Sequence, residues 1–302
     1  DLKNYIKKIG IKFKEINSFK IGYVPRNPKF FYDSLKVYSE KDLLTSGLFY
    51  FDEKNKKYVE RFRDRLIFPI NALNGSTIGF GGRVISNKNT YAKYINSPET
   101  FFFKKGNNLY NLDIARKFSN QSNEVFLVEG YMDVLSLNKF EIMNTVANLG
   151  TALTESQIQL LWRFYNQVII CFDGDDGGKK AASRAADKLI EIIKPDSNIS
   201  FLFLPDNHDP DSFINQNGKE KFLTYAKNKI SIYDFIWNHY SQNINFKEPS
   251  SLANLEKILK QKFQSIKDEM VKKYALEFFY EKISYLTPIS SFKKKNKNFF
   301  SN

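Results

Sequence analysis

The sequence has a single cysteine, Cys171, among its 302 residues, and that cysteine lies inside an apolar run. One cysteine cannot form an intramolecular disulfide or a zinc site built on paired thiolates. We therefore expect no zinc in this fragment, a buried position for Cys171 and a reducing cytoplasmic environment. No apolar run is long enough to cross a bilayer, and the first residue is Asp1 rather than methionine. We expect no membrane partner, no signal peptide and a chain that begins inside a longer protein.

Negative charge is the scarcer sign, because 33 Asp and Glu residues stand against 46 Lys and Arg residues, a net charge of +13. A surplus of this size favours a polyanionic partner such as nucleic acid. A lysine-rich bias of the whole proteome is the alternative explanation, since Lys, Asn, Ile and Phe are all abundant. Charge alone does not decide between the two.

Hydrophobic patterning divides the chain into three parts and predicts the fold class α/β. Residues 1–120 mix short helical and extended patterns with many aromatics, which indicates an α+β subdomain. Over 121–228, three apolar runs alternate with segments whose apolar residues recur at three- and four-residue steps. Such alternation predicts βαβ units and a largely parallel sheet. Residues 229–302 carry amphipathic helical patterns and end in SFKKKNKNFFSN, which we expect to be a poorly ordered basic tail.

Carboxylates follow each of the three apolar runs, EVFLVEG, QVIICFDGD and ISFLFLPD. In a parallel α/β sheet, ligands bind beyond the carboxyl ends of the strands, so we expect these side chains to share one crevice. The six residues are Glu129, Asp133, Asp173, Asp175, Asp209 and Asp211.

Like charges gathered in one crevice repel one another unless cations neutralise them. Two or more Mg²⁺ or Mn²⁺ ions would fit, because hard divalent ions prefer carboxylate oxygens. A pair of such ions can stabilise both the attacking and the leaving oxygen of an in-line phosphoryl displacement. For any single Asp the alternative is a helix cap, and Asp176 fits that alternative best, as a solvated cap or turn residue. His208 is a possible ligand, but the carboxylates suffice, and we interpret it as an exposed loop residue.

Basic residues concentrate in the first part of the chain. In RFRDRLIFPI, an extended backbone would place Arg61, Arg63 and Arg65 on one face. Downstream lie Arg83, Lys93 and the pair Lys104 and Lys105. Together they would form a track for phosphates, for which a solvated strand face is the alternative at each single position.

Two other phosphate-handling families are less consistent with the sequence. The run QVIICFD resembles the Asp-bearing strand of P-loop NTPases, but the sequence contains no G-x-x-x-x-G-K-[ST]. A receiver-type phospho-acceptor aspartate would not account for the Glu129 and Asp133 pair or for HDPD.

The motifs VEGYMDV, LGTALT, CFDGDDGG and FLPDNHDPD, in this order, resemble the TOPRIM module of bacterial DnaG-type primases. The segments RFRDRLIFPI, IGFGGRV, KYINSPET and KKGNNLY are similar to the N-terminal core of the same family. The similarity runs from about residue 5 to about residue 215. Other TOPRIM proteins, such as topoisomerases, lack the arginine-rich and SPET segments.

The resemblance implies a Rossmann-like TOPRIM fold between an N-terminal α+β subdomain and a C-terminal helical subdomain. It implies a DNA-directed RNA polymerase that makes short RNA primers on single-stranded DNA by two-metal nucleotidyl transfer. Glu129 and Asp133 would be catalytic, and Glu129, Asp173, Asp175, Asp209 and Asp211 would hold Mg²⁺ or Mn²⁺. Template and nucleotide phosphates would lie along Arg61, Arg63, Arg83, Lys93, Asn96 and Lys105.

The partners implied by the resemblance are single-stranded DNA, ribonucleoside triphosphates and the RNA–DNA hybrid product. A replicative helicase would bind through a C-terminal domain that we expect to lie outside this sequence, and the site of action would be the replication fork in the bacterial cytoplasm. The chain departs from the family pattern at Ile9, Asn107 and Lys179, where arginine is usual or frequent, and at Asp176, where a basic residue is often seen. Two alternatives stay open: a TOPRIM metal-dependent nuclease, and a non-catalytic module that binds DNA or a replication protein.

Overall fold

The computed structural model describes residues 2–26, 35, 37–85, 92–205 and 208–286. The chain divides into two compact units, Asp1–Ser122 with Leu127–Leu160 and Asn123–Phe126 with Leu161–Asn302. The boundary falls inside strand β7 (Glu124–Val128). The three-part division at residues 120 and 228 stays a prediction, and the basic tail lies outside the described residues.

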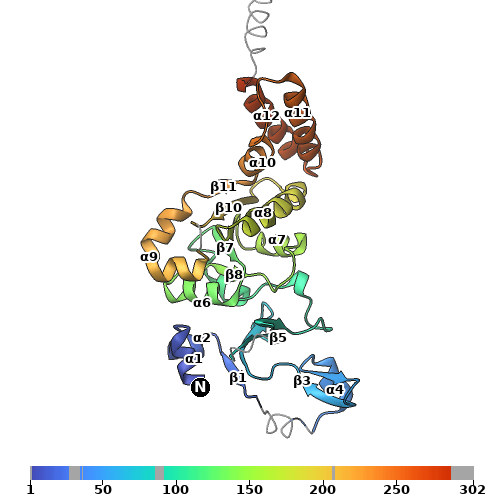
Figure 1. Ribbon diagram of the computed structural model, residues 1–302, viewed down its shortest axis with the longest axis vertical. Coiled ribbons are helices and arrows are strands. Elements are labelled where there is room, and N and C mark those ends of the chain that lie inside the picture. The colour runs from blue at the N-terminus through green and yellow to red at the C-terminus, as the bar shows by residue number, and fades with distance from the viewer. Residues whose placement is uncertain (1, 27–34, 36, 86–91, 206–207, 287–302) are drawn as a thin grey trace, which may run out of the picture. The chain divides into compact units, whose positions relative to one another are not determined.

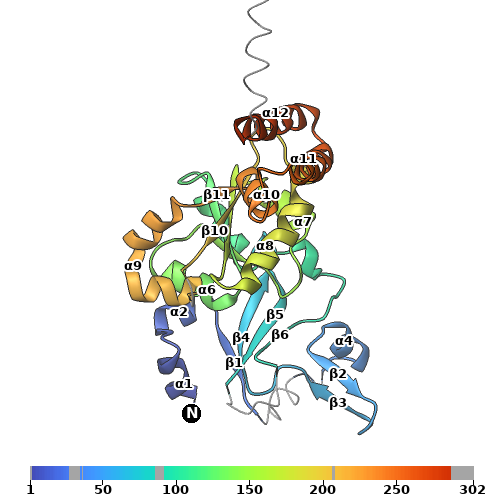
Figure 2. The same cartoon turned by 45° about the horizontal axis from the view of Figure 1, so that its top comes forward.

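The first unit contains an antiparallel sheet of four strands in the order β1-β4-β5-β6, which lie side by side in Figure 2. The strands are β1 (Gly22–Val24), β4 (Arg65–Asn71), β5 (Thr77–Val84) and β6 (Tyr94–Asn96). The central strand β4 supplies much of the core, because Leu66, Phe68 and Ile70 are at most 1% exposed. Aliphatic and aromatic side chains of this kind stabilise a strand when they pack against neighbouring residues.

A hairpin and several short helices complete this unit. The hairpin strands β2 (Phe49–Asp52) and β3 (Lys57–Glu60) pair antiparallel. The helices are α1 (Leu2–Lys8), α2 (Phe13–Ser18), α4 (Glu40–Thr45), α5 (Leu112–Ala115), α6 (Tyr131–Lys139) and α7 (Glu155–Leu161), with 3₁₀ turns η1 (Lys105–Asn107) and η2 (Arg116–Phe118).

A second sheet has five strands in the order β11-β10-β9-β7-β8. Its strands besides β7 are β8 (Thr145–Ala147), β9 (Gln167–Phe172), β10 (Asn198–Phe203) and β11 (Ile230–Ser231). Strands β9 and β10 pair in parallel from Gln167 opposite Asn198 to Phe172 opposite Phe203, whereas β11 runs antiparallel to β10. The predicted α/β class and largely parallel sheet are confirmed, and Cys171 is buried in β9.

Helices α8 (Asp176–Leu189) and α9 (Pro210–Ala226) and the 3₁₀ turn η3 (Ile190–Ile192) belong to the second unit. The unit ends in α10 (Ile232–Ser241), α11 (Pro249–Gln264) and α12 (Glu269–Leu286), and α11 packs against α12 (Figure 1). Their shared face is apolar, since Leu259, Phe263 and Phe279 are fully buried. No helix in the described part of the chain is long and apolar enough to span a membrane.

One local prediction is wrong. Residues 61–64 form a turn rather than an extended strand, with Asp64 at φ +57, and β4 begins only at Arg65. The three arginines therefore do not share one strand face. Arg63 is exposed, whereas Arg65 is only 5% exposed.

Candidate active site

Asp173 directly follows strand β9 and lies in a concentration of negative charge. Partial burial, then Asp209 and Asp175 as neighbouring charges, raises the pKa of the Asp173 carboxyl above its ordinary value. Burial and the two like charges both disfavour the ionised form of Asp173, and a bound cation would offset that cost. The second unit thus brings together three of the six predicted carboxylates.

Two glycines allow the chain to close around Asp173. A Cβ on Gly174 would lie 2.3 Å from the Leu204 carbonyl oxygen, and one on Gly178 would lie 2.2 Å from the Asp173 carbonyl oxygen. No L side chain fits at such distances. The glycines of CFDGDDGG therefore permit the segment after β9 to approach the segment after β10.

Asp175 and Asp209 each cap a helix through one carboxylate oxygen. Asp175 Oδ1 accepts a 2.7 Å hydrogen bond from the Gly178 amide at the start of α8. Asp209 Oδ1 accepts one of 2.7 Å from the Ser212 amide at the start of α9. Capping and metal binding are compatible, because a carboxylate has two oxygens and about four lone-pair sites.

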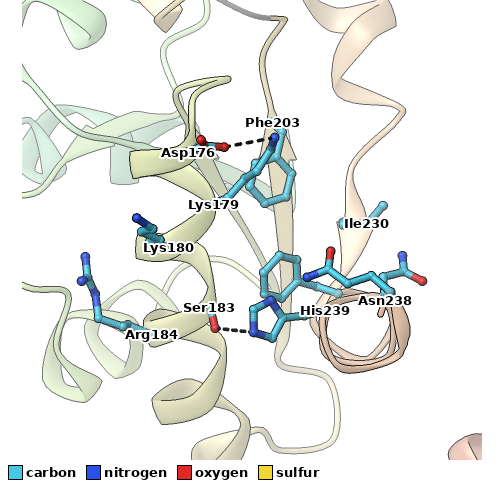
Figure 3. Close-up of a pocket in the computed structure, with 11 residues that line it drawn as sticks. Asp176, Lys179, Lys180, Ser183, Arg184, Phe203, Ile230, Asn238 and His239 are labelled. Carbon is cyan, nitrogen blue, oxygen red and sulfur yellow. Dashed lines mark hydrogen bonds and ion pairs between the residues drawn. The ribbon is translucent and has the colours of Figure 1, made fainter. Parts of the chain in front are cut away.

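Asp176 is solvated, as predicted, but the cap position itself is held by Asp175. Asp176 is the first residue of α8, has a 90% exposed side chain, and pairs with Lys179 at 3.7 Å (Figure 3). His208 is half-buried rather than exposed, and its Nδ1 lies 3.2 Å from Ser212 Oγ.

Figure 3 shows a pocket of about 590 Å³ in the same unit, between α8 and α10. Phe203 and Phe235 stack with centroids 5.7 Å apart, and Ser183 Oγ lies 3.1 Å from His239 Nε2. Lys179 reaches over Phe203, whereas Lys180 and Arg184 point away from α10. Asp176 of the acidic loop lines this pocket. The predicted metal ligands Asp173 and Asp175 are not among its lining residues.

Across the described ranges, no group of three or more His, Cys, Asp or Glu side chains is arranged to hold a metal ion. Both capping carboxylates are directed at their own helices, and residues 206–207 of the connecting loop lie outside the description. The donor chemistry nevertheless fits a hard divalent cation, because Asp173, Asp175 and Asp209 offer only carboxylate oxygens and the pKa of Asp173 is raised.

In the first unit, Glu129 and Asp133 flank the start of α6. Glu129 is exposed, whereas Asp133 is 8% exposed. Asp133 Oδ2 accepts a 2.9 Å hydrogen bond from the Gly130 amide. Asp133 thereby fixes the backbone next to Glu129. This bond is one half of a helix capping box, because Gly130 has no side chain to make the other half.

Tyr131 joins this turn to the antiparallel sheet of the same unit. Its hydroxyl donates to Asn96 Oδ1 at 2.7 Å, and Asn96 Nδ2 donates to the Leu149 carbonyl at 2.6 Å. The ring stacks on Phe68 at 5.0 Å and lies over Gly81, where a Cβ would be 2.3 Å from the ring. Asn96 therefore links three quoted motifs, VEGYMDV, KYINSPET and LGTALT.

Two of the predicted basic residues lie beside one aromatic ring. The Arg83 guanidinium carbon is 5.6 Å and Lys93 Nζ is 5.8 Å from the Tyr94 ring centroid. Arg83 Nε is buried with no hydrogen-bond partner among the described atoms. The pairing of β5 with β6 places Arg83 opposite Tyr94, the residue after Lys93, and Asn96 opposite Gly81.

Arg61 and Arg63 belong to the turn between β3 and β4. Arg61 Nε donates to the Gly47 carbonyl at 3.1 Å, and its guanidinium carbon lies 5.7 Å from the Tyr50 ring centroid. Arg63 pairs with Glu60 at 3.9 Å. Arg65 has a structural role, because its Nη1 donates to the carbonyls of Gly82 and Ala92 at 3.2 and 2.9 Å.

Sequence reasoning missed Gln157, which is fully buried in α7. Its Nε2 donates to the carbonyls of Lys105 and Asn108, each at 2.9 Å, and its Oε1 accepts from the Thr154 amide at 3.0 Å. Gln157 therefore holds the backbone at Lys105, a predicted phosphate contact. A polar residue facing an apolar side of a short helix was the only signal for it in the sequence.

Two family models match the chain: the N-terminal domain of the DNA primase catalytic core over residues 1–116, and a Toprim-like domain over residues 126–214. A solved DnaG primase catalytic domain bound to single-stranded DNA is 32% identical, with a TM-score of 0.86 over 94% of this chain and 88% of that one. The chain belongs to the DnaG primase catalytic core family. A DNA primase domain from Pseudomonas aeruginosa gives 32% identity and a TM-score of 0.85, with the same coverage.

Among full-length DnaG-family relatives, the DNA primase of Clostridium acetobutylicum is 39% identical over 277 residues, which is 90% of this chain and 45% of that protein. The chain spans about half the length of the curated relatives that it matches. The Toprim-like match implies divalent metal binding in the primase family. The family predicted from the motifs is confirmed, whereas the role of each site residue stays a prediction.

Proposed function

We propose that this chain is the RNA polymerase core of a bacterial DNA primase, which joins ribonucleotides on a single-stranded DNA template. The observation that carries the proposal is the match to DnaG catalytic cores over 94% of the chain, one of them bound to single-stranded DNA. The concentration of negative charge at Asp173 supports it, because nucleotidyl transfer needs bound cations.

Glu129, Asp173, Asp175, Asp209 and Asp211 are the proposed ligands of two or more Mg²⁺ or Mn²⁺ ions. Such ions would lower the pKa of the attacking hydroxyl and neutralise charge on the phosphoryl oxygens. Asp133 is proposed to hold the Gly130 backbone so that Glu129 stays in position, in agreement with their 2.9 Å hydrogen bond.

Template and nucleotide phosphates are proposed to bind Arg61, Arg63, Arg83, Lys93 and Lys105. Arginine suits this role, because its planar fork makes bidentate contacts with phosphate. Asn96 is proposed to act by positioning, since its side chain already bridges Tyr131 and Leu149. The proposed partners are single-stranded DNA, ribonucleoside triphosphates and the RNA–DNA hybrid product, with the replicative helicase as a further partner at the bacterial replication fork.

A template-dependent incorporation assay tests the proposal. The 302-residue chain, with Mg²⁺ or Mn²⁺, single-stranded DNA and labelled ribonucleoside triphosphates, should make short RNA. Asp173→Ala and Glu129→Ala should lose incorporation, and Asp176→Ala, which changes an exposed neighbour, should keep it. Full polymerisation by either of the first two variants would contradict the proposal.

The nuclease and the non-catalytic module are not favoured, because the matches cover the N-terminal primase core as well as the TOPRIM module. Labelled DNA in the same reaction separates the nuclease, since only a primase builds ribonucleotides into oligomers. Failure to bind Mn²⁺ would favour the non-catalytic module.

A further inference from the structure

Two neighbouring phenylalanines in the loop after β6 are exposed. Phe101 is 91% and Phe102 is 75% exposed. Their rings meet edge to face, with centroids 5.2 Å apart and planes at 88°. An isolated apolar side chain on a surface is ordinary, but two adjacent aromatic rings with most of their area in water form a patch that fits a binding partner.

The backbone of the loop is anchored on both sides of the two rings. The next residue, Phe103, is fully buried, and a Cβ on Gly79 would lie 3.1 Å from its ring. The Thr100 amide donates to the Phe103 carbonyl at 2.9 Å, and the Phe103 amide donates to Thr100 Oγ1 at 3.1 Å. Phe103 anchors a closed turn, so Phe101 and Phe102 are presented outward without a large entropic cost on binding.

The charges next to the rings identify the partner. Lys104 and Lys105 follow directly, and the side chain of Lys104 is 53% exposed while it pairs with Glu99 at 3.6 Å. Aromatic rings for bases beside cations for phosphates are the composition of surfaces that bind single-stranded nucleic acid. A protein partner is less consistent with two adjacent lysines, because lysine is depleted at protein interfaces.

We propose that Phe101 and Phe102 form a stacking surface for unpaired bases of single-stranded nucleic acid, flanked by phosphate contacts from Lys104 and Lys105. The inference rests on the proposed function and adds to it a site for the bases. Stacking is tolerant of sequence, because every base has a π-face. The surface holds the strand and takes no part in bond making.

The test measures binding of the 302-residue chain to two labelled strands of about 16 nucleotides by fluorescence anisotropy. One strand is oligothymidine, and the other has the same length and charge but carries stable abasic residues in place of nucleosides. Phe101→Ala with Phe102→Ala should weaken oligothymidine binding by about fivefold to a hundredfold and leave abasic binding unchanged. The slope of log affinity against log salt should stay as in the wild type, because no phosphate contact is lost.

Three further variants serve as controls. Phe13→Ala removes a phenylalanine that is 76% exposed elsewhere in the same unit, and it should bind both strands normally. Lys104→Ala with Lys105→Ala should weaken binding of both strands and reduce the slope of log affinity against log salt by about 1.4. Replacing both Phe101 and Phe102 by leucine keeps the patch apolar but removes the rings, and it should bind as weakly as the alanine variant.

The results separate this inference from the proposed function. The stacking surface is overturned, while the primase proposal stands, if the alanine variant binds oligothymidine like the wild type. The same holds if its affinity falls equally for oligothymidine and for the abasic strand. Rescue of oligothymidine binding by leucine likewise overturns the stacking surface, because apolar contact without an aromatic ring would then be enough. A wild-type chain that binds no single-stranded DNA and incorporates no ribonucleotide overturns both.

Discussion

The hydroxyl of Tyr131 donates a 2.7 Å hydrogen bond to Asn96 Oδ1, and this contact joins the turn that carries Glu129 to strand β6. Burial, followed by the proximity of Tyr94, raises the pKa of Tyr131, so the phenol stays protonated and remains a donor. The neighbouring Tyr110 makes an edge-to-face contact with the same ring at 4.6 Å, but its buried hydroxyl has no partner among the described atoms.

These two tyrosines are a matched pair for testing the contact. Tyr131→Phe should lower the free energy of unfolding by about 0.5–1.5 kcal/mol, the usual contribution of one hydrogen bond. Tyr110→Phe should be neutral or stabilising, because it removes a buried hydroxyl that no described atom satisfies. Urea unfolding of both variants measures the difference. A larger loss in Tyr110→Phe than in Tyr131→Phe would show that this assignment of partners is incorrect.

The fit of the Tyr131 ring over Gly81 predicts a strong effect of one methyl group. A Cβ on Gly81 would lie 2.3 Å from the ring, which itself packs against Phe68. Gly81→Ala should therefore destabilise the chain by about 1–3 kcal/mol through overpacking. Gly22→Ala is the control in the same sheet, since the nearest atom to its Cβ would be 3.8 Å away. Equal unfolding midpoints for the two variants would mean that the ring moves aside freely.

The raised pKa of Asp173 predicts how stability depends on pH when no metal is bound. The folded chain holds this proton more tightly than the unfolded chain, whose carboxyl titrates near its ordinary value of 3.8. Stability therefore falls as pH rises from that value through the raised one, and the loss persists at neutral pH. In a chelator, Asp173→Asn should unfold at higher urea than the wild type at pH 7, and the gap should close near pH 3.5.

When Mn²⁺ is added at neutral pH, the wild type should unfold at higher urea than Asp173→Asn. Metal that binds only the folded state adds stability as its concentration exceeds the dissociation constant, and the wild type has the fuller ligand set. Asp176→Asn is the control, because its 90% exposed carboxylate forms an ion pair with Lys179 at 3.7 Å on the surface of α8 and should affect neither response. A wild type that Mn²⁺ leaves unchanged would remove Asp173 from the proposed ligands.

The sequence predicted what depends on local pattern. Strands β9 and β10 are apolar runs long enough to be recognised, and α8 and α10 repeat their apolar residues at helical spacing. Helix α9 was missed, because Gly218 interrupts its backbone at φ +77 and weakens the helical period. The short strands β8 and β11 were missed because two or three residues carry no periodic signal.

What the sequence did not predict is either a detail of the backbone at one residue or a contact between distant residues. The positive φ of Asp64 turns the arginine-rich segment away from an extended path, although its alternating pattern is typical of a strand. Asp175 and not Asp176 caps α8, and one residue more or less before a helix cannot be distinguished by composition. The carboxylates were predicted because they come after apolar strands, whereas Gln157 contacts partners 49 and 52 residues away.

Gln157 provides the last prediction, because it supports Lys105 without being charged or exposed. Gln157→Ala leaves the Lys105 and Asn108 carbonyls without their 2.9 Å donor, so it should cost about 1–3 kcal/mol of unfolding free energy. Gln157→Glu should be at least as harmful, since it keeps the acceptor for Thr154 but offers no donor. Gln159→Ala, on the exposed side of the same helix, should stay within about 0.5 kcal/mol of the wild type. If Gln157→Glu were as stable as the wild type, the donated hydrogen bonds would not be what holds this segment, and the conformation at Lys105 would have to depend on Phe103 and Thr154 instead.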